Sequence, residues 1–175
     1  HFSISNQKSA IRNHMTHIRY SVACCQTDMP NPIDRKGMKA NTDRVLSMID
    51  SAVAGAAPFL PVRLVVFPEF AHAAPVFPTV AELLEKLAVK IPNEHTERLE
   101  AKAREHDIYI QTGTMLETDP KWPGNVFNTT CLIGPSGILY KYRKVNTWIP
   151  YEVHTSPHDL SDYNEDLFPV ADTPI

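Results

Sequence analysis

The sequence predicts an α/β layered fold, in which helices pack against a β-sheet. Short apolar runs typical of strands alternate along the chain with longer stretches of helical periodicity. Two of these runs flank the turn sequence Gly134-Pro135-Ser136-Gly137, which predicts a β-hairpin. Of the 175 residues, 43% are hydrophobic and 21% are charged, which is enough apolar material for one core.

The first third of the chain predicts two strands on either side of a long helix. Residues 18–26 are mostly apolar, which predicts a buried strand. Residues 36–57 repeat apolar side chains at helical spacing, and Pro58 and Pro61 end that helix. Residues 64–67 are continuously apolar, so we expect a short strand over residues 63–67 that is buried on both faces.

The remainder predicts two capped helices and three strands. Thr79 and Glu82 have the spacing of a capping box, and Asn93 can cap a second helix that runs to about residue 106. We expect residues 117–125 to form a polar loop and residues 151–174 an acidic, irregular tail. The three strands are expected over residues 108–115, 126–133 and 138–143.

Two ionisable residues stand directly after predicted strands. Glu69 follows Pro68, which has no N–H for a sheet ladder and so ends its strand. Lys144 follows the second strand of the hairpin. A carboxylate and an ammonium that meet at strand ends are typical of a catalytic pair, in which Glu69 would act as the general base and Lys144 would stabilise an oxyanion. The alternatives are a capping carboxylate and a surface lysine, and we expect Arg143 and Lys141 to be surface residues of that kind.

The segments around these two residues resemble motifs of the nitrilase superfamily of carbon–nitrogen hydrolases. The motifs are Phe67-Pro68-Glu69 and Tyr142-Arg143-Lys144, and the run Trp148-Ile149-Pro150-Tyr151-Glu152 is most similar to the aliphatic amidase branch. The resemblance covers residues 18–175 and implies part of a four-layer α-β-β-α sandwich. Residues 1–17 are then an N-terminal extension or a remnant of cloning.

The resemblance implies hydrolysis of a non-peptide carbon–nitrogen bond by a Glu, a Lys and a Cys. Glu69 and Lys144 match two of these residues, and Glu152 matches a second Glu that supports the Lys in amidase-like members. Phe70 and Trp148 would wall a small substrate pocket, although core packing is nearly as good an interpretation of both. A small amide would be cleaved to an acid and ammonia, with no metal or organic cofactor.

The third member of that triad, the Cys, has no good candidate. Cys24, Cys25 and Cys131 lie inside predicted strands, so we expect them to be buried and unreactive. In the family the catalytic Cys follows a strand that begins after a Thr-Pro turn, and here the chain reaches Thr173-Pro174 and ends. We therefore expect an N-terminal portion of a hydrolase, incomplete at its C-terminus, with the Cys on a polypeptide that carries the C-terminal half.

Two other functions stay open. The same residues would serve a nitrilase that acts on a nitrile, or the chain would be a non-catalytic fragment that acts as an interaction module. A zinc site is a weak alternative, because Pro157 interrupts the helical spacing of the group His154, His158, Asp159 and Asp162. Three other histidines are expected to be surface or capping residues: His72, His95 and His106.

Composition limits the partners. A net charge of -3 argues against nucleic acid, and no apolar run approaches the length of a membrane span. Three cysteines do not make a disulfide framework, so the expected compartment is the cytoplasm. The expected partners are a small amide or nitrile, the polypeptide with the C-terminal half, and further copies of the chain in a homo-oligomer.

Overall fold

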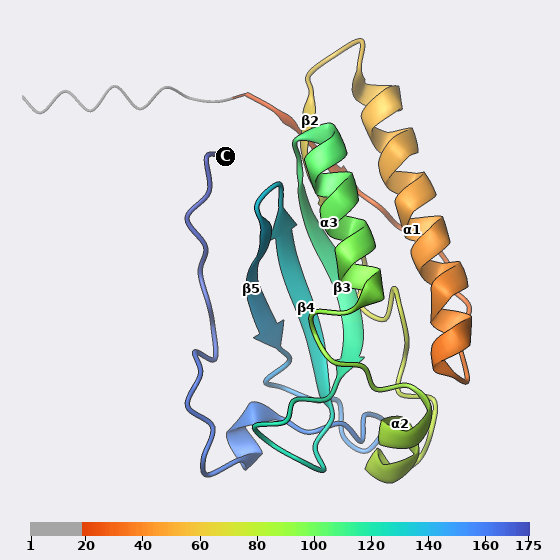
Figure 1. The fold of residues 1–175 in the computed structure, drawn as a ribbon, viewed down its shortest axis with the longest axis vertical. Helices are drawn as coiled ribbons and strands as arrows, with labels where there is room; N and C mark the ends of the chain where they lie inside the picture. The colour runs from red at the N-terminus through yellow and green to blue at the C-terminus, as the bar shows by residue number, and fades with distance from the viewer. Residues whose placement is uncertain (1–18) are drawn as a thin grey trace, which may run out of the picture.

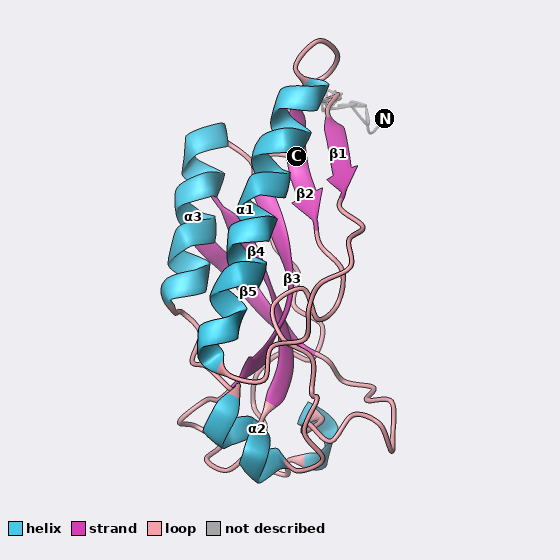
Figure 2. Ribbon diagram, turned by 90° about the vertical axis from the view of Figure 1, so that its right-hand side faces the viewer, coloured by secondary structure: helices cyan, strands magenta, loops and turns pink. Residues whose placement is uncertain are grey.

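The computed structural model describes residues 19–175, which form one five-stranded sheet with helices on one of its faces (Figures 1 and 2). The expected extension, residues 1–17, lies outside the described residues. Along the sheet the strands follow the order of the chain, the first three parallel and the last three antiparallel. The strands are β1 (Ser21–Cys24), β2 (Val62–Val66), β3 (Tyr109–Glu117), β4 (Phe127–Gly134) and β5 (Gly137–Arg143). The layered α/β class predicted from the sequence is therefore confirmed.

Each of the three helices begins at a side-chain cap. Asp34 accepts a hydrogen bond from the backbone of the first turn, and Thr79 and Asn93 do the same for the two later helices, as the sequence predicted. A short 3₁₀ helix, Pro157–Asp159, is the regular element of the tail. The helices are α1 (Arg35–Ala56), α2 (Val80–Lys86) and α3 (Glu94–His106).

The main core lies between the sheet and the pair α1 and α3. Val45 and Ile49 of α1 and Leu99 of α3 are fully buried, and they pack against Val65 and Ile110 of the central strands. Each such side chain contributes about 1.5–3 kcal/mol of transfer free energy. This layer fixes the sheet whose strand ends carry the candidate site.

The opposite face of the sheet carries no helix within residues 19–175 (Figure 2). Val22 is 47% exposed there, and Leu64 and Val66 are only half-buried, so the expectation that the second strand is buried on both faces was wrong. The same alternation of side chains exposes Cys24, because β1 is an edge strand and points that residue at the uncovered face.

The three cysteines therefore differ in burial. Cys25 is half-buried, while Cys131 faces the helical layer and is buried as expected. Burial raises the pKa of the Cys131 thiol to about 12, so it stays protonated at neutral pH. The expectation of buried thiols is correct for Cys131 and wrong for Cys24.

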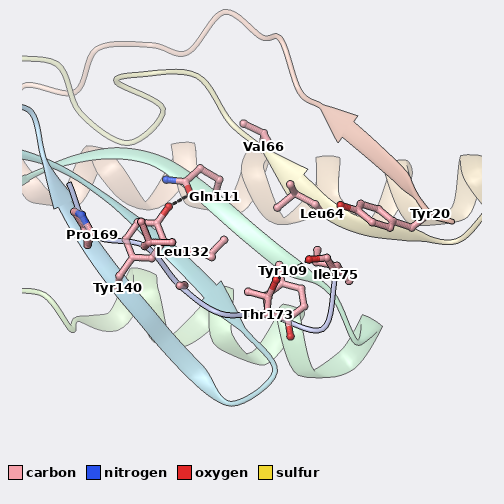
Figure 3. Close-up of a pocket in the computed structure, with 12 residues that line it drawn as sticks. Tyr20, Leu64, Val66, Tyr109, Gln111, Leu132, Tyr140, Pro169, Thr173 and Ile175 are labelled. Atoms are coloured by element: carbon pink, nitrogen blue, oxygen red, sulfur yellow. Dashed lines mark hydrogen bonds between the residues drawn. The ribbon is translucent and has the colours of Figure 1, made fainter. Parts of the chain in front are cut away.

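The C-terminal tail runs across the uncovered face and encloses a hollow with it (Figure 3). The hollow has a volume of about 410 Å³. Leu64 of β2, Tyr20 just before β1 and Ile175 of the tail line it, and Tyr140 donates a hydrogen bond to Gln111 at 3.2 Å. One sheet with one helical layer is the arrangement expected for half of an α-β-β-α sandwich.

Candidate functional site

The turn that carries Glu69 is fastened to the neighbouring strand β3. Phe70 has a φ of 61°, a left-handed conformation that is uncommon for a non-glycine residue and is typical of functional sites. Its backbone N–H donates to the Thr114 hydroxyl at 2.8 Å. On either side, Phe67 and His72 donate backbone hydrogen bonds to carbonyl groups of β3. The Glu69 carboxylate therefore stands on a fixed backbone.

Gly113 makes this close approach possible. It has a φ of 72°, and a Cβ atom built on it would lie 2.4 Å from the Pro68 carbonyl oxygen and 2.6 Å from the Ala71 Cβ. No side chain fits at that distance, so only glycine allows the turn to rest on β3.

Lys144 lies directly after β5 and reaches two carboxylates. Its Nζ lies 2.9 Å from Glu69 Oε1 and 2.8 Å from Glu152 Oε2. The Lys144 backbone N–H donates to the Asn128 carbonyl at 2.8 Å, which ties the lysine to β4. The structure thus brings together all three charged residues that the sequence singled out.

These contacts keep the lysine and one carboxylate charged. Partial burial lowers the pKa of Lys144, but its hydrogen bonds to Glu152 and Glu69 outweigh burial and leave the pKa raised. Burial likewise raises the pKa of Glu152, and the hydrogen bonds from Lys144 and the Trp148 backbone more than reverse this, so the pKa is lowered. At neutral pH the ammonium and the Glu152 carboxylate form an ion pair.

Asn128 is a site residue that the sequence reasoning missed. Its Nδ2 donates to Glu69 Oε1 at 2.7 Å, so this oxygen accepts from both Asn128 and Lys144. Together with Glu69, Lys144 and Thr114, it lines a hollow of about 350 Å³. It lies opposite Lys144 only because the register of the hairpin shifts between Leu132 and Ile133, and the sequence carries no local signal for that shift.

The two aromatic residues expected to bind substrate do not line this hollow. Phe70 is half-buried in the turn after Glu69. Trp148 is 67% exposed, lies against Tyr151 with ring centroids 4.7 Å apart, and donates its backbone N–H to Glu152 Oε2 at 2.6 Å. Their role in binding substrate stays a prediction.

Arg143 is buried, so the expectation of a surface residue was wrong. Its guanidinium contacts the carboxylates of Glu117, Asp119 and Glu165 at 2.6 to 2.9 Å. Glu117, expected in a polar loop, is instead the last residue of β3 and is only 1% exposed. Charged groups are buried only with partners of opposite charge. Because Glu117 was expected in a loop, Arg143 had no predicted partner and was expected at the surface.

Two histidines expected to be surface or capping residues are also buried. His72 and His95 both approach the Thr42 hydroxyl, with Nδ1 distances of 3.3 and 2.9 Å. Burial, helped by the nearby His95, lowers the pKa of His72 from 6.5 to about 4, so its ring is neutral at neutral pH. Because the His72 ring also contacts the Thr112 carbonyl at 3.0 Å, the network ties the chain after Glu69 to β3 and α1.

The structure brings potential metal ligands together at a different place from the group around His154 that the sequence suggested. Within residues 19–175 the group that comes together is Asp50, Glu105 and His106, not the set around His154. Asp50 already accepts hydrogen bonds from Lys102 and His106, both at 2.7 Å.

Within residues 19–175, none of the helices is long and apolar enough to cross a membrane.

Comparison with known proteins agrees with this geometry. Residues 21–175 match the family model described as carbon-nitrogen hydrolase. The chain is 34% identical to the human omega-amidase NIT2 over 107 residues, which are 61% of this chain and 34% of that protein. It is 26% identical to a formamidase of Helicobacter acinonychis over 76% of this chain and 38% of the relative.

Solved structures share the fold. Saccharomyces cerevisiae Nit3, a member of branch 10 of the nitrilase superfamily, matches with a TM-score of 0.61 at 23% identity, over 77% of this chain and 47% of Nit3. An N-terminal amidase with a bound Asn-Glu-Ala peptide matches with a TM-score of 0.63 at 18% identity, over 78% and 31% of the two chains. The chain thus spans less than half the length of each of these relatives. On the family match over nearly its whole length, the chain belongs to the carbon–nitrogen hydrolase family.

Proposed function

We propose that the complete protein hydrolyses a small amide to a carboxylic acid and ammonia. The observation that carries this proposal is the position of Lys144 Nζ, 2.9 Å from Glu69 and 2.8 Å from Glu152, at the edge of a hollow. The omega-amidase and formamidase relatives support an amide as the substrate.

Each charged residue has a separate task in this proposal. Glu69 takes the proton of a cysteine thiol, and the thiolate attacks the amide carbon. Lys144 stabilises the negative charge that develops on the oxygen, and Glu152 holds Lys144 in place. Ammonia leaves with a proton returned by Glu69, and water that Glu69 activates then hydrolyses the thioester.

The cysteine comes from a part of the protein that packs on the uncovered face of the sheet. Cys131 is a poor nucleophile because burial raises its pKa to about 12. The half-buried apolar residues of β2 and the hollow beside them provide a surface for a second sheet. The same contact would complete the four layers and bring the nucleophile to Glu69.

Substitution of Glu69 by Gln in the complete protein tests the proposal. The Gln side chain keeps the shape of Glu but cannot take a proton, so kcat for a small aliphatic amide substrate should fall by ~10²–10⁴-fold or more. Glu97→Gln, on the exposed side of α3, is the matched control and should leave kcat unchanged. Normal turnover by folded Glu69→Gln protein would refute the assignment.

A further inference from the structure

His154 is a buried residue whose ring nitrogens are both unpaired. Its side chain is fully covered, yet neither Nδ1 nor Nε2 hydrogen-bonds to any residue in the range 19–175. A buried polar atom without a partner is destabilising, and an apolar ring of the same shape would avoid that loss. Packing alone therefore does not explain a histidine at this position.

The backbone around His154 aims the ring toward the ion pair. Burial alternates along the segment, so that Glu152, His154 and Ser156 are buried. The Thr155 backbone N–H donates to the Val126 carbonyl at 2.6 Å, and the Ser156 hydroxyl donates to the Val145 carbonyl at 2.5 Å. Held in this way, His154 places Nε2 3.9 Å from Glu152 Oε2.

We infer that His154 is a positioning residue for the Glu152–Lys144 ion pair. With its proton on Nε2, the ring would present a donor 3.9 Å from the carboxylate that holds the lysine and would limit the directions in which that carboxylate can turn. A separation of 3.9 Å is longer than a hydrogen bond, but such contacts in unliganded sites tighten when substrate binds. The inference rests on the proposed role of Lys144.

The electrostatic setting agrees with a neutral donor. Burial lowers the pKa of His154 below its usual 6.5, which outweighs the opposite effect of Glu152. Lys144 adds to the lowering, and Glu69 opposes it. A neutral imidazole can donate one N–H to Glu152 on closer approach, without adding a positive charge that would compete with Lys144 for the carboxylate.

Two variants of the complete protein separate this role from packing. His154→Phe keeps the ring shape and removes both nitrogens, so we expect the melting temperature to stay the same or to rise. We expect kcat for the amide to fall by about tenfold or more with little change in KM, because Lys144 acts on the transition state. His154→Gln restores an N–H donor and should recover most of kcat. His158→Phe, at an exposed position nearby, is the control and should match the wild type.

Three outcomes would overturn the inference: a wild-type kcat in His154→Phe, a marked loss of its stability, or a His154→Gln variant as slow as His154→Phe. If the wild-type protein cleaves no amide, the proposed function fails, and a second measurement judges the inference. Loss of the donor should loosen the hold on Lys144, so trinitrobenzenesulfonate should label Lys144 severalfold faster in His154→Phe, as read by peptide mapping. Unchanged labelling of Lys144 would refute the role independently of activity.

Discussion

Replacing Arg143 by Met tests the buried charge cluster that ends β5 next to Lys144. The guanidinium donates through Nε and Nη2 to Glu117, through Nη2 also to Asp119, and through Nη1 to Glu165. It also lies 4.6 Å from the ring centroid of Phe127. Met keeps much of the apolar contact while it removes the charge.

The expected loss follows from the burial of Glu117. Its side chain is 1% exposed, and without Arg143 the remaining cation in contact is Lys141. Breaking a buried ion pair by removing one partner costs about 3–5 kcal/mol. We expect the free energy of unfolding of the complete protein to fall by that amount in Arg143→Met, measured by urea denaturation.

The pH dependence gives a second, independent signature. Burial raises the pKa of Glu117, but the hydrogen bond from Arg143 and the charge of Lys141 outweigh it, so the pKa lies below 4.5 in the folded wild type. The wild type therefore loses this stabilisation as the pH falls below 4.5. In Arg143→Met burial dominates and the carboxyl protonates more easily when folded. The gap in stability between the two proteins should be widest at neutral pH and should narrow on acidification.

Arg104→Met is the matched control, because Arg104 is 55% exposed and its Glu100 partner lies 3.8 Å away. Exposed ion pairs contribute about 0–1 kcal/mol, so this variant should differ little from the wild type. An Arg143→Met protein that loses no more than the control, or a gap that does not change with pH, would refute the reasoning.

Three further predictions concern other parts of the chain. Asn128→Leu in the complete protein should lower kcat and affect KM less, because Glu69 loses a hydrogen bond that orients its carboxylate. A kcat equal to that of the wild type would show that Asn128 does not position Glu69. His72 has its pKa lowered from 6.5 to about 4, so the unfolded chain binds a proton that the folded one does not, and stability should fall by about 3 kcal/mol as the pH drops between those values; His72→Gln should lose that dependence in a urea-midpoint series. Cys24 is exposed in this chain but should react slowly with Ellman's reagent in the complete protein if a second sheet covers its face, and fast labelling would argue against that cover.

Local signals in the sequence were enough to predict the elements and the charged site. Pro68 ends β2 and Thr79 and Asn93 begin helices through chemistry confined to a few neighbouring residues, so these features could be predicted. Glu69 and Lys144 could be predicted because Lys144 directly follows β5 and Glu69 lies in the turn shortly after β2.

The missed residues depend on register and on which face of the sheet is covered. Counting back from the two-residue turn places Phe127 opposite Lys144, but the register shifts between Leu132 and Ile133, and Asn128 takes that position instead. Arg143 and Cys24 were misplaced because strand alternation gives two faces and does not say which one is buried. Long-range packing decides both questions, and a single sequence contains little information about it.

The two oxygens of Glu69 have different hydrogen bonds, and on the proposed mechanism this difference would give the reaction a direction. Oε1 accepts from Asn128 and Lys144, whereas Oε2 has no hydrogen-bond partner within the described part of the chain. A proton can therefore be taken up without breaking either contact only at Oε2. If Glu69 is the base, the thiol has to arrive on the Oε2 side, while the substrate oxygen has to lie near Lys144 on the Oε1 side. On the proposed mechanism, the asymmetry of this carboxylate would decide from which side the thiol approaches the amide.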